Sequence, residues 1–116
     1  MECKITASKS FNKELKRLGK RYASLADDYE TLLHDLKQNP ALGTDLGRGL
    51  RKVRMRISSK GKGKSGGARV ITFTVIASVD ETTINLLYIY DKSERENISP
   101  KEIDALLIAN GFIAQP

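Results

Sequence analysis

Residues 50–91 decide the fold of this chain, and they read LRKVRMRISSKGKGKSGGARVITFTVIASVDETTINLLYIYD. From 50 to 58 apolar and cationic residues alternate, which is the period of a strand with one buried face. The ranges 68–77 and 83–90 are rich in Val, Ile, Thr, Phe and Tyr, and Asp80 marks a turn between them. The stretch therefore predicts a meander of three antiparallel strands.

The first of these strands separates its side chains by chemistry. Its apolar residues share one face, and its cations share the other, where they repeat every ~6.6 Å. These cations are Lys52, Arg54 and Arg56. Their spacing resembles that of successive phosphates along a nucleic-acid strand.

Two helices are predicted before the meander. Apolar residues recur at helical spacing over 11–22 and again over 25–36. Ser10 is the expected N-cap of the first helix, and Asn39 and Pro40 end the second. A short connection makes the pair a helical hairpin, which must bury its apolar stripe on a sheet.

The remaining segments complete an α+β fold. Residues 4–7 are expected to form a short strand and 41–49 a loop, while Ser99, Pro100 and Glu102 mark the start of a last helix. We predict one domain over residues 1–116. It is an antiparallel sheet of about four strands packed on an N-terminal helical hairpin, with a C-terminal helix.

Composition narrows the classes of function. With 116 residues, 40% of them hydrophobic and 29% charged, the chain suits one globular domain. No apolar stretch approaches the ~20 residues that cross a bilayer, and the amino terminus lacks a signal core, so we expect a cytoplasmic protein without a membrane partner. Cys3 is the only cysteine and His34 the only histidine, which argues against a Cys/His metal site and against a Ser/His or Cys/His hydrolase. No cofactor is expected.

The positive charge is concentrated in one segment. Residues 48–69 hold nine cations and no acid, whereas the rest of the chain holds 11 cations and all 14 acids. Such a patch is typical of a protein that binds a polyanion, most often nucleic acid. The alternative is a solvated basic face that only maintains solubility.

The glycines inside this segment do not indicate a nucleotide fold. Gly61, Gly63 and Gly66 match G-x-G-x-x-G, but that motif opens a helix, and here a strand follows. We interpret the stretch as the tip of a hairpin whose lysines contact a nucleic-acid backbone.

Three fragments resemble the RelE/ParE superfamily of bacterial toxins, especially its HigB-like branch. They are GLRKVR at 49–54, GKGKSGGARVI at 61–71 and LLYIYDKSERENIS at 86–99, and the resemblance extends over roughly residues 4–108. It implies a small α/β protein with the element order derived above. It also implies a cognate antitoxin encoded beside the toxin, and a DNA operator contacted through the toxin–antitoxin complex.

The superfamily contains two activities. Members similar to RelE and HigB cut messenger RNA on the ribosome without metal, whereas ParE-like members inhibit DNA gyrase. The dense row of cations favours the mRNA endoribonuclease. A ParE-like gyrase inhibitor and a non-catalytic basic RNA-binding module are the alternatives.

Metal-free RNA cleavage needs a proton acceptor, a proton donor and cations that neutralise the phosphorane. Clustered positive charges favour a lysine that exchanges its proton, so Lys52 is the candidate acid or base, and Arg69, which matches the family's arginine, is expected to hold the phosphate beside Arg54. The full set of predicted catalytic residues is Lys52, Arg54, Arg69, Asp91 and Lys92. The predicted RNA-binding residues are Arg51, Arg56, Lys60, Lys62, Lys64, Tyr90 and Arg95.

Strict counting creates a conflict for Arg69. It shares a strand face with Ile71 and Phe73, the expected core side. A bulge near Gly66 and Gly67 is one device that would reset this register.

Overall fold

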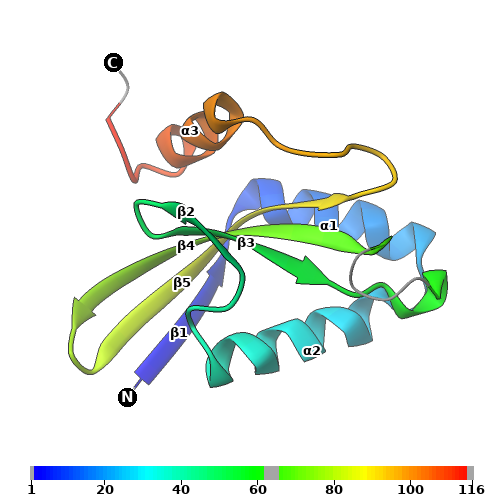
Figure 1. Cartoon of the computed structure of the whole chain (residues 1–116), viewed down its shortest axis with the longest axis horizontal. Coiled ribbons are helices and arrows are strands. Elements are labelled where there is room, and N and C mark those ends of the chain that lie inside the picture. Colours follow the sequence, from blue (N-terminus) through cyan, green and yellow to red (C-terminus); the bar gives the residue numbers. More distant parts are fainter. Residues whose placement is uncertain (1, 62–65, 115–116) are drawn as a thin grey trace.

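A five-stranded sheet with strand order β1-β5-β4-β3-β2 forms the centre of the computed structural model, which describes residues 2–61 and 66–114 (Figure 1). The strands are β1 (Glu2–Ala7), β2 (Thr44–Gly47), β3 (Leu50–Met55), β4 (Ala68–Ser78) and β5 (Glu81–Asp91). The helices are α1 (Lys9–Arg21), α2 (Leu25–Gln38) and α3 (Pro100–Ala109), with one 3₁₀ turn, η1 (Ser58–Lys60). The predicted α+β class is confirmed.

The predicted meander is confirmed, and the sheet extends beyond it on both sides. β3, β4 and β5 pair antiparallel in sequence order. At one edge β1 pairs with β5 in parallel, and at the other β2 pairs with β3. The expectation of a loop over 41–49 was therefore wrong, because Thr44–Gly47 forms a strand. All four of its residues are exposed, so it has no alternation by which the sequence could reveal it.

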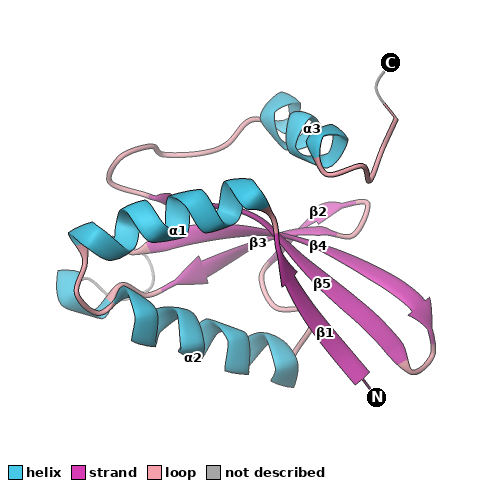
Figure 2. Cartoon of the chain, turned by 180° about the vertical axis from the view of Figure 1, so that it is seen from behind, coloured by secondary structure: helices cyan, strands magenta, loops and turns pink. Residues whose placement is uncertain are grey.

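The helical hairpin forms as predicted, but its first cap differs. Figure 2 shows α1 and α2 side by side on the same side of the sheet, joined by a short turn. The Ser8 hydroxyl accepts a hydrogen bond from the backbone N–H of Phe11 at 3.0 Å, so α1 begins at Lys9. Ser10 lies inside the first turn, and the prediction that it caps the helix was wrong.

The sheet is covered on both faces by two separate apolar clusters. One lies beneath α1 and α2 and includes Phe11, Leu18, Leu36 and Val70. The other lies beneath α3, and its buried members are Leu50, Ile71, Leu87, Tyr90, Ile98, Ile103 and Leu107. Each face of the central strands is therefore at least partly buried by apolar packing.

The C-terminal helix follows its predicted signals. The Ser99 hydroxyl accepts from the Glu102 backbone N–H while the Glu102 carboxylate accepts from the Ser99 N–H, a complete capping box. After the helix, Phe112 packs against Phe73 with ring centroids 5.0 Å apart. Among the described residues, no helix is both long and apolar enough to cross a bilayer.

Candidate nucleic-acid interface

Three predicted cations meet on the sheet face beneath α3, and we call them the basic row: Lys52, Arg54 and Arg69. Arg54 on β3 and Arg69 on β4 are direct cross-strand partners. Lys52 lies two residues before Arg54, so it projects from the same face. The pairing register of β3 and β4 therefore brings Arg54 and Arg69 together, although the connection between the two strands separates them in sequence.

The conflict over the face of Arg69 is resolved without a bulge beside Gly66 and Gly67. Arg69 does share its face with Ile71, as strict counting indicates, because β3 and β4 pair in register from Met55 opposite Ala68 to Leu50 opposite Phe73. This face is apolar where α3 covers it and basic at its other end. The irregularities of β4 lie farther along, between Ile71 and Thr72 and between Ile76 and Ser78.

Arg69 lies in an unfavourable setting for a cation. Only 5% of the residue is exposed, and its guanidinium donates to the Ala68 carbonyl at 3.3 Å. Burial lowers the pKa of Arg69, and the positive charge of Arg54 lowers it further. Arginine remains charged at neutral pH, so an anion placed between the two guanidiniums would relieve this repulsion.

The segment that leads into α3 lies against the basic row. Lys52 Nζ donates to Asn97 Oδ1 at 3.0 Å. Arg95 donates to both carboxylate oxygens of Glu102 at 2.8 and 2.7 Å, and its Nε donates to the Asn97 carbonyl at 3.0 Å. The hydrogen bonds that Arg95 donates to Glu102 raise the pKa of Arg95. Sequence reasoning missed Asn97, because a polar residue just before a helix start gives no signal of a contact with a distant strand.

Tyr90 belongs to the same rung of the sheet but is almost completely covered. It pairs with Arg69 across β4 and β5, and 2% of it is exposed. The Arg95 guanidinium lies 5.7 Å from its ring centroid. In this arrangement the ring is covered, so the predicted stacking of a base on Tyr90 lacks the open surface that it needs.

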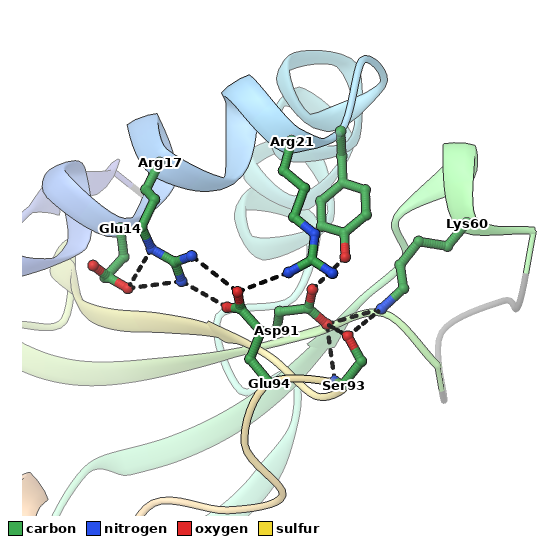
Figure 3. A network of polar contacts seen from close by, with 8 residues as sticks. Glu14, Arg17, Arg21, Lys60, Asp91, Ser93 and Glu94 are labelled. Atoms are coloured by element: carbon green, nitrogen blue, oxygen red, sulfur yellow. Dashed lines mark hydrogen bonds and ion pairs between the residues drawn. The ribbon is translucent and has the colours of Figure 1, made fainter.

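Asp91 lies on the opposite sheet face, inside a buried polar network (Figure 3). Its carboxylate accepts from Lys60 Nζ at 2.8 Å, from the Ser93 hydroxyl at 2.7 Å and from the Tyr22 hydroxyl. Burial alone raises the pKa of Asp91, but the hydrogen bonds from Lys60, Tyr22 and Ser93 outweigh it and hold this pKa well below its ordinary value. The structure therefore separates Asp91 from the basic row.

This network fixes Lys60 as well. Its side chain is 11% exposed and pairs with Asp91, and its ammonium lies 5.4 Å from the centroid of the Tyr22 ring. Next to it, Glu94 bridges Arg17 at 2.6 Å and Arg21 at 2.8 Å (Figure 3). These ion pairs hold the segment after β5 against the C-terminal end of α1. The spacing of apolar residues in the strand and the helix does not predict this contact.

The other predicted residues surround the row or lie apart from it. Arg56 is exposed just after β3, and Lys92 is exposed just after β5, where its backbone N–H donates to the Gly67 carbonyl at 3.1 Å. Arg51 alternates with Lys52 and so projects from the other sheet face. Lys62 and Lys64 lie outside the described residues.

An open cavity adjoins the row at the edge of β3. It has a volume of about 450 Å³ and is lined by Leu42, Gly43, Thr44, Lys52, Val53 and Arg54. The basic row therefore has space beside it for a ligand as large as a nucleotide.

Residues 4–115 match the family model described as the RelE toxin of the RelE/RelB toxin–antitoxin system. The match extends over nearly the whole chain and agrees with the superfamily indicated by the sequence motifs. The HigB-like branch stays a prediction.

Proposed function

The chain belongs to the RelE toxin family, and from that premise we propose that it is an mRNA endoribonuclease that cuts translated messages on the ribosome and so inhibits translation. Its partners are then a cognate antitoxin, which the family implies, and mRNA held in the ribosome. Operator DNA is contacted through the antitoxin complex, and the site of action is the cytoplasm.

One observation carries this proposal: Arg54 and Arg69 face each other across β3 and β4. Like charges directly opposite each other destabilise a sheet. Such a pair, with Arg54 lining an open cavity at the edge of β3, is suited to an anion that bridges both guanidiniums. The phosphodiester of RNA is the anion expected for this family.

The reaction assigns a task to each member of the basic row. The ribose 2′-hydroxyl loses a proton, its oxygen bonds to phosphorus, the bond from phosphorus to the 5′-oxygen breaks, and that oxygen gains a proton. The products are a 2′,3′-cyclic phosphate and a free 5′-hydroxyl. Arg54 and Arg69 neutralise the extra negative charge of the phosphorane, and Lys52, oriented by Asn97, carries a proton.

Lys92 and Arg95 complete the rim of this site in the proposal. Asp91 and Lys60, which face each other in the buried network, hold the strand end and do not contact RNA. The proposed catalytic residues are therefore the three cations of the basic row, Lys52, Arg54 and Arg69.

The decisive experiment is to induce the chain alone in a bacterium and map the 5′ ends of translated messages. We expect new ends in phase with codons, and none when translation initiation is blocked or when Arg69→Ala is expressed at the same level. Growth arrest without new ends would overturn the proposal in favour of gyrase inhibition. Normal growth without new ends would leave a non-catalytic basic module.

A further inference from the structure

A pocket lies between the turn that joins β2 to β3 and the start of α3 (Figure 1). Its volume is about 240 Å³. This is room for a flat ring system such as a nucleobase, because one molecule of liquid water takes up ~30 Å³. Leu50, Ile98 and Ile103 line the pocket, and each of them is almost fully buried. Its lining is therefore mainly apolar, which suits the faces of an aromatic ring.

Lys52 connects this pocket to the basic row. It lines the pocket and also the open cavity at the edge of β3, which Arg54 lines as well. Leu50, Lys52 and Arg54 alternate along β3, so they share a face and follow one another at ~6.6 Å. A nucleotide whose phosphate contacts Arg54 can therefore place its ribose beside Lys52 and its base in the pocket.

Arg48, at the rim of the pocket, has a backbone conformation that arginine rarely adopts. Its φ is 56°, and it lies between two glycines that also have positive φ. A side chain with a Cβ is disfavoured in this region, and such residues are concentrated at functional sites. The Arg48 guanidinium donates to Asp104 on α3 at 2.7 Å, but the two side chains are 58% and 45% exposed. Because an exposed ion pair adds little stability, this contact orients Arg48 without explaining why arginine is there.

The polar side chains of the pocket offer hydrogen-bond donors. Asn97 lines the pocket, and its Oδ1 already accepts from Lys52 at 3.0 Å. Its Nδ2 group donates to no acceptor among residues 2–61 and 66–114. Arg48 uses one nitrogen for Asp104, and a guanidinium has five N–H donors. The described lining includes no carboxylate, so the pocket suits a flat ligand with adjacent acceptors at its edge.

We propose that this pocket binds a guanine base of the mRNA, next to the phosphate that is cut. Guanine presents two adjacent acceptors, O6 and N7, and arginine is the commonest partner of that edge. Adenine carries an amino group in place of O6, which would set a donor against the donors of Arg48 and Asn97. A pyrimidine would bury less apolar surface. The inference rests on the proposed function for its substrate and adds a base preference to it.

The first test measures nucleotide binding without cleavage. The probes are four 2′-deoxynucleoside 3′,5′-bisphosphates that carry guanine, adenine, cytosine or uracil, and they cannot be cut because they lack the 2′-hydroxyl. In calorimetry with the full chain, the guanine compound is expected to bind about tenfold more tightly than each of the others. Equal affinities for all four compounds would overturn the proposal.

Arg48→Gly tests the proposed base contact. Glycine adopts the positive φ of this turn without strain, so the variant is expected to fold, and thermal unfolding checks this. Its affinity for the guanine compound should fall to that of the other three. Lys37→Gln, which removes one exposed cation from α2, is the matched control and should keep the preference. An equal loss for all four compounds in Arg48→Gly would overturn the proposal, because Arg48 would then act by charge alone.

Leu46→Trp tests the location of the base. Leu46 lines the pocket and is 39% exposed, so a larger side chain there fills the pocket from its rim. The preference for guanine should disappear. Ile76→Trp, at a position on β4 that is 73% exposed and does not line the pocket, is the matched control and should bind as wild type does. A preserved preference in Leu46→Trp would place the base elsewhere and refute the proposal.

Mapped mRNA ends separate this inference from the proposed function and identify the source of the guanine. If the chain cuts mRNA, guanine should be enriched at one position beside the cut, and Arg48→Gly should lose that enrichment. Cutting without any enrichment would overturn the pocket and leave the nuclease. A guanine preference in calorimetry without cutting in cells would refute the nuclease and support the pocket as a guanine site.

Discussion

Arg54 and Arg69 are direct cross-strand partners on one face of the sheet, and Arg69 is almost fully buried there. Two guanidiniums in this relationship repel each other, and the folded chain retains that repulsion. An anion that binds both side chains then stabilises the folded protein as well as occupying its site.

Removing one member of this pair should therefore stabilise the free protein. We expect Arg54→Gln to raise the free energy of unfolding by up to about 1 kcal/mol, since a like-charge cross-strand pair is lost. A short RNA oligonucleotide should raise the Tm of wild type more than that of Arg54→Gln, as measured by thermal unfolding. Lys13→Gln, at an exposed position on α1 on the other side of the sheet, is the control and should leave both values unchanged. A less stable Arg54→Gln would contradict this reasoning.

Loss of the basic row should abolish toxicity without unfolding the protein. Arg69→Ala and Lys52→Ala are each expected to lower the cleavage rate by about 10²–10³, the usual effect of removing one charge-stabilising donor. The measurement is growth after induction together with the yield of new mRNA 5′ ends. Lys101→Ala, an exposed cation on α3, should behave as wild type. Retained toxicity in both row variants would show that the site lies elsewhere.

The buried pair of Asp91 and Lys60 should contribute strongly to stability and give it a defined pH dependence. Asp91→Asn leaves a lysine without its counter-ion, which typically costs about 3–5 kcal/mol in a buried pair. Because the folded pKa of Asp91 is depressed, its stabilisation is complete above the ordinary pKa of ~3.9 and is lost as the pH falls toward the folded value. In urea denaturation, the difference between wild type and Asp91→Asn should be full at pH 7 and shrink below about pH 4. An equal difference at pH 7 and pH 3 would argue against this linkage.

Gly67 should tolerate no side chain, whereas Gly61 should. A Cβ on Gly67 would meet the Met55 carbonyl oxygen at 2.2 Å, so Gly67→Ala must push β3 and β4 apart beside the basic row. We expect a loss of about 1–3 kcal/mol in unfolding free energy, as is typical of overpacking. Gly61 has a φ of +69° and open space around it, so Gly61→Asn is the matched control, because asparagine tolerates this conformation. Chemical denaturation of both variants measures the contrast.

The sequence predicted those elements that carry a periodic pattern, a strand-forming composition or cap residues. β3 follows from alternation, β4 and β5 follow from their β-branched and aromatic residues, the helical hairpin follows from helical spacing, and the start of α3 follows from its capping box. β2 escaped prediction because its four residues are exposed and only pairing with β3 holds them. The position of the first cap was missed because Ser8 and Ser10 both precede an apolar helical stripe, and only the backbone decides between them.

For the candidate site, the sequence predicted the cations but only part of their arrangement. Lys52 and Arg54 share a face by alternation, and register then adds Arg69. The separation of Asp91 from this row depends on Tyr22 and Lys60, which are far from it in sequence and reach it only in the folded chain. The resemblance to the family grouped Asp91, a carboxylate at a strand end, with the site, whereas strand alternation turns it to the opposite face.

The parallel pairing of β1 with β5 has a consequence for synthesis of the protein. The first strand, Glu2–Ala7, pairs with residues from Glu81 onward, so the start of the chain must wait for the last strand before the sheet can close. A nascent chain that ends before β5 has neither this sheet nor the surface on which α3 rests. The five-stranded sheet therefore closes only after residues 81–91 have been synthesised.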